Sequence, residues 1–167
     1  FAYPIMKESA QFFVDYLTKD PDTGYLVSGP SISPENHYLT PQGQTAAIIM
    51  GPAMDQQIIY NLFTNCINAA KTLNSDHDFS RKISSLRKKL MPTKIGPDGR
   101  ILEWSKPLKE ADPAHRHVSH MFALYPGKQI NPDQTPKLAK AAQKTLLIKN
   151  QYTKGSGPGW SHAFKAG

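Results

Sequence analysis

Apolar side chains recur every three or four residues along several stretches of this chain, which is the spacing of one face of an α-helix. The longest such stripe predicts a helix over residues 52–73. Shorter stripes predict helices over residues 5–17, 79–90 and 136–149. Proline, glycine and aspartate follow the first stripe at residues 20–24, so that helix is expected to end in a turn.

The segments between these stripes predict a second set of shorter elements. Residues 25–27 and 100–104 are expected to be extended, residues 115–124 to form a short helix, and residues 160–164 to begin a last one. Long loops separate helix pairs, and shorter breaks lie within the pairs. That order is typical of an all-α fold of stacked helical hairpins, such as an α/α toroid, with a helical bundle as the alternative.

Composition narrows the classes of function. The 167 residues suffice for one domain with a core, and residues 1–167 are taken as a single unit. The net charge of +7 is scattered without interleaved aromatic side chains, so no nucleic-acid partner is expected. No apolar run approaches the roughly 20 residues needed to span a bilayer, so no membrane partner is expected. Cys66, the one cysteine, is expected to be buried among apolar residues.

Candidate chemistry begins at Glu35, in a loop that includes Gly29, Pro30 and Pro34. Two prolines fix the backbone locally and can aim a carboxyl group into a cleft, as a general acid requires. The acid role also needs burial, which favours the protonated form. The competing interpretation is structural, with Glu35 capping a helix or pairing with a lysine.

Two further polar segments, residues 103–104 and 112–120, combine carboxylates, imidazoles and aromatic rings, and residues 157–162 form a third. Such groups suit a sugar, whose C–H face packs on an aromatic ring while polar side chains hold its hydroxyl groups. Structural alternatives remain for each: a salt bridge for Glu103, a core position for Trp160, and capping for the histidines and for Asp112. Asp55 is expected to complement the dipole of the long helix or to line the cleft mouth.

A metal site is not expected from the histidines. In a helix, His117 and His120 would share a face, but His115 would not join them.

Six motifs occur in order along the chain: Ser31-Ile-Ser-Pro-Glu-Asn36, Met54-Asp-Gln-Gln-Ile-Ile59, Arg100-Ile-Leu-Glu-Trp104, Asp112-Pro-Ala-His-Arg-His-Val-Ser-His120, Leu124-Tyr-Pro-Gly127 and Gly159-Trp-Ser161. Together they resemble the catalytic domain of the α-L-fucosidases of glycoside hydrolase family 95, over nearly the whole chain. The resemblance implies an (α/α)6 barrel that releases terminal α-1,2-linked L-fucose with inversion, without a cofactor or metal. It places the general acid on Glu35. The candidate sugar contacts are Asn36, Glu103, Trp104, His115, His117, His120 and Trp160.

The chain departs from the family in extent. The barrel has more helices than the five or six predicted here, and the family's water-activating asparagine pair would precede Phe1. The chain is therefore expected to be a partial domain with the general-acid half of the machinery and no hydrolase activity of its own. Its partner would be a fucosylated glycan, its parent would be secreted or periplasmic, and self-association through open barrel edges is expected. The alternatives are an α-L-galactosidase of the same family, a non-catalytic carbohydrate-binding remnant and a basic helical interaction module.

Overall fold

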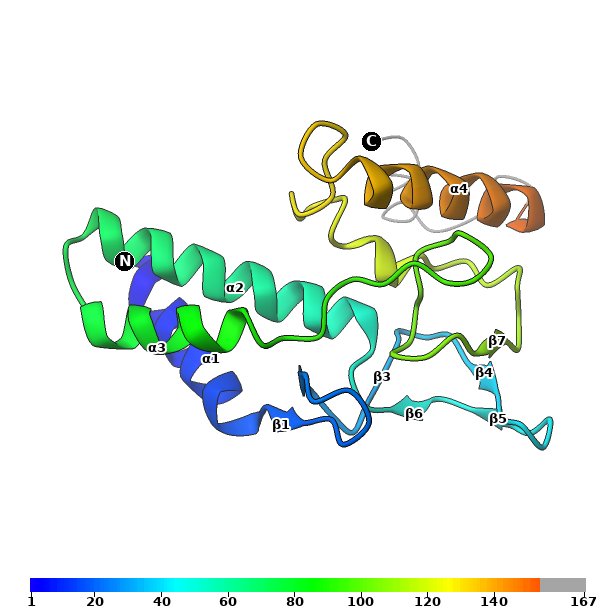
Figure 1. Ribbon diagram of the computed structural model, residues 1–167, viewed down its shortest axis with the longest axis horizontal. Helices are drawn as coiled ribbons and strands as arrows, with labels where there is room; N and C mark the ends of the chain where they lie inside the picture. The colour runs from blue at the N-terminus through cyan, green and yellow to red at the C-terminus, as the bar shows by residue number, and fades with distance from the viewer. Residues whose placement is uncertain (154–167) are drawn as a thin grey trace.

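The computed structural model describes residues 1–153, and four α-helices dominate them (Figure 1). Their bounds are α1 Ala2–Tyr16, α2 Ala53–Thr72, α3 His77–Arg87 and α4 Pro136–Thr153. The helices predicted over residues 5–17, 52–73, 79–90 and 136–149 are therefore confirmed, with shifted ends. The helix predicted over residues 160–164 lies outside the described residues.

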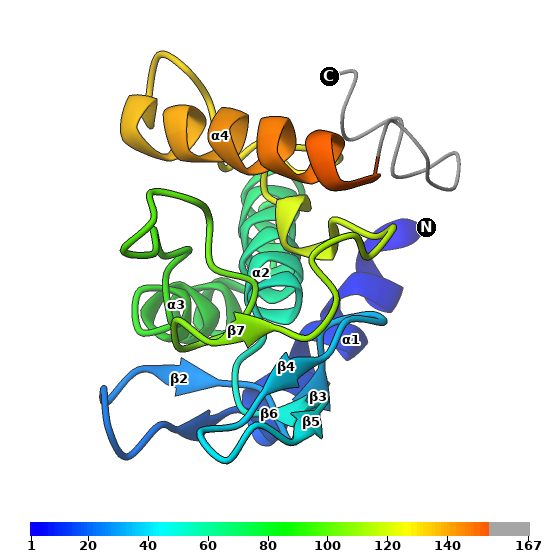
Figure 2. The ribbon, with the colours of Figure 1, turned by 90° about the vertical axis from the view of Figure 1, so that its right-hand side faces the viewer.

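Seven two-residue strands accompany the helices, so the predicted all-α class is confirmed only as a helix-rich fold. They are β1 Thr18–Lys19, β2 Leu26–Val27, β3 Ser31–Ile32, β4 Tyr38–Leu39, β5 Thr45–Ala46, β6 Ile48–Ile49 and β7 Lys109–Glu110. They pair antiparallel as β1–β2, β3–β6 and β5–β4–β7. Strand β2 lies within the extended segment predicted at residues 25–27. In Figure 2, strands β2 to β7 lie below α2.

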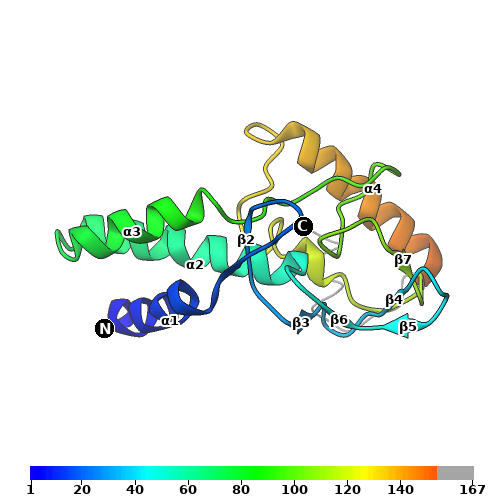
Figure 3. The same cartoon turned by 60° about the horizontal axis from the view of Figure 1, so that its bottom comes forward.

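Helices α1 and α3 pack against α2 and form the first of two hydrophobic cores (Figure 3). Its fully buried members come from all three helices: Ala10, Ile59, Phe63, Cys66 and Ile83. Cys66 is thus a buried apolar residue, as predicted, and burial raises the pKa of its thiol. The turn into α3 places Asn74 and Asp76 at positive φ, which these residue types tolerate better than most. Lys7 of α1 pairs with Asp76 at 2.6 Å and ties α1 to this turn.

A second core lies between α4 and the segment that leads to it. Its buried members are Ile101, Val118, Met121, Ala123, Ile130, Ala141 and Ala142. Ile101, in the segment predicted to be extended, forms an isolated antiparallel bridge with Ile95 and donates its N–H to Thr145 Oγ1 at 2.9 Å. None of the described helices is long and apolar enough to cross a membrane.

The helix predicted over residues 115–124 is wrong, since only a single 3-10 turn, η1, forms there at Ser119–Met121. The reason is a buried side chain of α2. Gln57 donates from Nε2 to the His120 carbonyl at 2.9 Å and accepts the Ala123 N–H on Oε1 at 2.8 Å. Backbone groups that a helix would pair internally are satisfied by a residue more than 60 positions away in sequence.

Candidate functional site

The loop around Glu35 is held at both ends and in its middle. At its start, Ser28 donates from Oγ to Asp55 Oδ2 at 3.0 Å in the first turn of α2, and burial raises the pKa of Asp55. Gly29 has φ +138°, and a side chain there would meet Met50 Sδ at 2.7 Å. At its end, the Asn36 N–H donates to the Ser33 carbonyl at 2.9 Å and closes a tight turn. Glu35 lies at the centre of that turn, after a cis peptide bond.

Glu35 projects from this turn towards the histidine-rich loop. Its Oε2 lies 2.6 Å from Arg116 Nη2 and 3.9 Å from His117 Nδ1. The Glu35 side chain is 61% exposed, so the described residues do not supply the burial expected for a general acid. The predicted structural alternative, an ion pair, is present, with an arginine 81 positions away as the partner. Such an exposed pair is typically worth under about 1 kcal/mol, so a ligand can displace it.

Three potential metal-ligating side chains meet at this point: Glu35, His115 and His117, whose donor atoms lie within 4.8 Å of one another. This set differs from the His117 and His120 pair considered above, because η1 turns His120 towards Glu103 instead. Burial and neighbouring cations lower the pKa of His115 and of His117, so both imidazoles are neutral near pH 7. Arg116 shares the same Glu35 oxygen, and its positive charge disfavours a cation there.

A buried polar network lies directly beneath the Glu35 turn, around Glu103. Ser33 Oγ donates to Glu103 Oε1 at 2.7 Å, and Asn36 Nδ2 donates to Glu103 Oε2 at 3.0 Å. Burial raises the pKa of Glu103, against the opposing effects of Lys149 and of these two hydrogen bonds. His120 Nδ1 lies 3.6 Å from Glu103 Oε2, but burial lowers the pKa of His120 to about 3. His120 is therefore neutral, and the two residues do not form an ion pair.

Glu110 extends the network to α4. It accepts from Asn36 Nδ2 at 3.3 Å, from Arg100 Nη1 at 2.8 Å and from the fully buried Lys149 Nζ. Burial alone would raise the pKa of Glu110, but Lys149 and Arg100 outweigh it and hold the pKa below its ordinary value. The structural salt bridge that was predicted for Glu103 is thus formed instead by Glu110, which lies close to it in the network.

Trp104 packs its ring edge-to-face on Tyr38, with centroids 5.6 Å apart, and is only 3% exposed. It lines a cavity of about 240 Å³ together with Glu103, Glu110 and His120. Trp104 Nε1 and His120 Nδ1 have no hydrogen-bond partner among residues 1–153. The cavity therefore suits a small polar molecule such as water.

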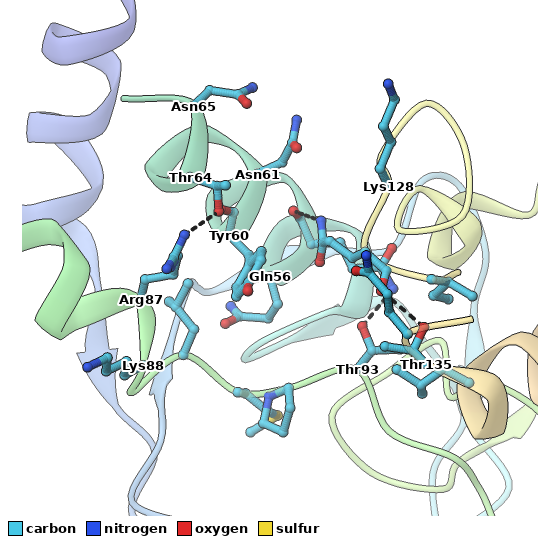
Figure 4. Close-up of a pocket in the computed structure, with 18 of the residues that line it drawn as sticks. Gln56, Tyr60, Asn61, Thr64, Asn65, Arg87, Lys88, Thr93, Lys128 and Thr135 are labelled. Atoms are coloured by element: carbon cyan, nitrogen blue, oxygen red, sulfur yellow. Dashed lines mark hydrogen bonds between the residues drawn. The ribbon is translucent and has the colours of Figure 1, made fainter. Parts of the chain in front are cut away.

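A second concavity, of about 900 Å³, is lined by α2 and by residues from 87–93 and 126–138 (Figure 4). Polar side chains of α2 line it, and Arg87 donates to Thr64 Oγ1 at 2.8 Å while lying 5.2 Å from the Tyr60 ring centroid. Neither Glu35 nor any of the histidines contributes to it. Because no carboxyl group lines it, we place the candidate chemistry at Glu35.

The structure divides the predicted site residues into two layers. Glu35 is exposed, His115 is half-buried and His117 is buried, and their donor atoms meet at one point. Beneath them, the buried layer comprises Asn36, Glu103, Trp104 and His120. Trp160 lies outside the described residues.

No role was predicted for Ser33, Glu110, Arg116 or Lys149. Ser33, Glu110 and Arg116 contact these layers, and Lys149 pairs with Glu110. The spacing along the chain gives no signal for such long-range pairs. Asp112 was predicted to cap the helix that follows it, but no helix begins there; its Oδ1 instead accepts the Ala114 N–H at 2.9 Å within a turn.

Comparison with known proteins now adds to this geometry. The family model for the glycosyl hydrolase family 95 catalytic domain matches residues 1–167. Alpha-L-fucosidase 2 of Arabidopsis thaliana is 37% identical over 165 residues, which cover 98% of this chain and 19% of that protein. Probable alpha-fucosidase A of Aspergillus niger is 31% identical over 171 residues, which cover 98% of this chain and 21% of that protein. The chain thus spans about a fifth of the length of the curated relatives it matches.

Proposed function

This chain belongs to the catalytic domain of glycosyl hydrolase family 95, and we propose that the protein containing it releases terminal α-L-fucose from 1,2-linked glycans with inversion, with Glu35 as the general acid. The observation that most supports this role is the fixed turn over residues 33–36, which displays a carboxyl group beside two neutral imidazoles. Both curated relatives named above are called fucosidases, one of them as a probable assignment. In this proposal, α1 to α4 form part of the wall of an (α/α)6 barrel.

The chemistry of an inverting glycosidase assigns one task to this chain. A general acid gives its proton to the glycosidic oxygen while a water molecule, activated by a base on the other face of the sugar, attacks the anomeric carbon. The two groups stand roughly 6.5–9.5 Å apart to leave room for that water. We place the activating residues outside this chain and the acid at Glu35.

The ion pair with Arg116 then describes the site without substrate. A bound glycan that displaces Arg116 and covers Glu35 favours the neutral, protonated form of the carboxyl group, which is the form that donates. His115 is half-buried and His117 is buried beside Glu35, and in this proposal their imidazoles hydrogen-bond sugar hydroxyl groups. The other candidate sugar contacts are buried, namely Asn36, Glu103, Trp104 and His120. They would touch a bound sugar only from beneath the Glu35 turn.

The test uses a full-length protein containing this sequence. Glu35→Gln should lower kcat on a fucosylated oligosaccharide by about 10²- to 10⁴-fold, the usual contribution of a general acid, while fucose binding is retained. Glu8→Gln, an equivalent change at an exposed position of α1, should leave kcat unchanged. Unchanged turnover in Glu35→Gln would refute the acid role, and binding without turnover in the unmodified protein would favour a carbohydrate-binding remnant.

Stereochemistry provides a second, independent check. Nuclear magnetic resonance of the first sugar released from an α-L-fucoside should show the β-anomer. Initial appearance of the α-anomer would show retention and contradict the inverting mechanism.

A further inference from the structure

The Glu35 turn is fastened to one buried carboxylate from both of its sides. Ser33 lies two residues before Glu35 and Asn36 one residue after it, and each donates to a different oxygen of Glu103. The two donors are 0% and 1% exposed, and Glu103 itself is 5% exposed. Because charged groups are seldom buried without a structural or functional requirement, this arrangement needs an explanation.

Glu103 is in turn attached to the start of α2. Its backbone carbonyl accepts the Ala53 N–H at 3.0 Å, which attaches it to the first residue of α2. The next residue, Trp104, packs on Tyr38 of β4, which follows the Glu35 turn. The carboxylate of Glu103 therefore connects the turn to a helix that is buried against both α1 and α3.

Both oxygens of Glu103 are occupied by these contacts, which separates it from a sugar ligand. Oε1 accepts from Ser33, while Oε2 accepts from Asn36 and faces the neutral His120. Asn36 is equally committed, since Oδ1 accepts the His37 N–H at 2.9 Å and Nδ2 is shared between Glu103 and Glu110. Every polar atom of these two side chains thus already has a buried hydrogen-bond partner, which a sugar would have to share or displace.

We propose that Glu103 is a positioning residue for the general acid: by holding Ser33 and Asn36 it fixes where the Glu35 carboxyl group meets the glycosidic oxygen. This inference rests on the proposed function of Glu35 and revises the expected sugar-contacting role of Glu103 and Asn36. Proton transfer requires donor and acceptor within hydrogen-bond reach, so a displacement of about 1 Å can cost about 100-fold in rate.

The test compares two substrates in the full-length protein. The first is a fucosylated oligosaccharide, whose sugar leaving group needs a proton. The second is α-L-fucosyl fluoride, whose fluoride departs with little protonation. Glu103→Leu removes both acceptor oxygens, so it should lower kcat on the oligosaccharide by about 100-fold and kcat on the fluoride by less than about fivefold. KM for both substrates should change little, because binding groups are untouched.

The conservative variant should restore activity. In Glu103→Gln the amide oxygen can accept from Asn36, and the amide N–H can donate to Ser33 Oγ after the hydroxyl group rotates. Its kcat on the oligosaccharide should therefore stay within about fivefold of the unmodified protein. Asp76→Asn, which removes a carboxylate at the start of α3, should leave both substrates unaffected.

Equal losses on both substrates in Glu103→Leu would mean a merely structural role and would overturn the proposal, as would no loss on either. If Glu103→Leu does not fold, Ser33→Ala decides the question, because Glu103 then keeps Asn36. It should lose about tenfold on the oligosaccharide alone, and an unchanged ratio of the two rates would overturn the proposal. Glu35→Gln must itself show the dependence on the leaving group; if it does not, the proposed function fails first and this inference fails with it.

Discussion

Two of the buried regions among residues 1–153 differ in chemistry: the core around α2 is apolar, and the network beneath the Glu35 turn is polar. Around α2, apolar side chains of three helices meet, and Phe63 and Ile59 lie at 0% exposure. Beneath the Glu35 turn, the buried groups are instead carboxylates, a hydroxyl group, an amide and an ammonium group, joined by directional hydrogen bonds. Apolar packing tolerates small shifts, whereas a hydrogen bond weakens steeply with angle and distance. The helical region therefore supplies stability, and the polar region defines a geometry.

This contrast also explains why the site stands where it does. The turn over residues 33–36 has no apolar residue that could hold it in the core, and Ile32 before it is exposed. A turn of this composition keeps one conformation only if buried partners satisfy its polar groups. Glu103 does so from below, and the Pro34 carbonyl accepts from Ser119 Oγ at the histidine-rich loop.

The largest expected effect is a loss of stability in the apolar core around α2. Phe63→Ala removes a fully buried ring from α2 and leaves a cavity, which should destabilise the helical region by about 3–5 kcal/mol. Hydrogen exchange of α2 amides in the full-length protein measures the change. Tyr60→Ala, at a 38% exposed position on the same helix, should cost clearly less. Equal losses at both positions would contradict a core centred on Phe63.

The next largest effect is a loss of stability in the polar network around Glu110. Lys149→Met leaves the buried carboxylate of Glu110 with Arg100 as its remaining cation, and the cost should be about 2 kcal/mol, below that of a fully orphaned charge. Adding Glu110→Gln should recover part of the loss, because the uncompensated charge is then gone. Hydrogen exchange of α4 amides provides the measurement. Arg81→Met, at an exposed pair with Asp78, serves as the control and should change nothing measurable.

A pH experiment sharpens the comparison further. His120 has a pKa of about 3 in the folded protein, below the ordinary value of about 6.5, so the unfolded chain takes up its proton first as the pH falls. The stability contribution is complete above about pH 6.5 and declines by about 1.4 kcal/mol per pH unit below it. His120→Gln should remove this dependence relative to the unmodified protein, as hydrogen exchange at pH 7 and pH 5.5 would show. An unchanged slope would contradict a buried neutral imidazole.

Local sequence was sufficient wherever local physics decided the structure. The apolar periodicity correctly predicted α2, α3 and α4, because the buried face of an amphipathic helix carries an apolar residue every three or four positions. The prolines and glycine around Glu35 correctly indicated a constrained loop. The prediction for the histidine-rich segment was wrong. The spacing of its residues suggested a helix, but Gln57 of α2 satisfies its backbone groups in another conformation.

The partners within the site could not be predicted in this way. Ser33 and Glu103 are 70 positions apart, and Glu35 and Arg116 are 81 apart. Lys149 sits on the predicted α4 helix, yet no periodicity could show that its ammonium group is fully buried against Glu110. Such contacts depend on how separate elements pack together, and the residues near each position in the sequence do not indicate that packing.

The sequence by itself determined the helices, the presence of a carboxyl group in a constrained loop and the family to which the motifs belong. The tertiary structure decided that Glu35 stands beside Arg116, His115 and His117, and that Glu103 lies buried beneath it. The physical reason is the range of the forces involved. Helix periodicity and turn chemistry act over a few residues, whereas buried polar groups are satisfied by whatever distant partner the packed fold brings within hydrogen-bond reach.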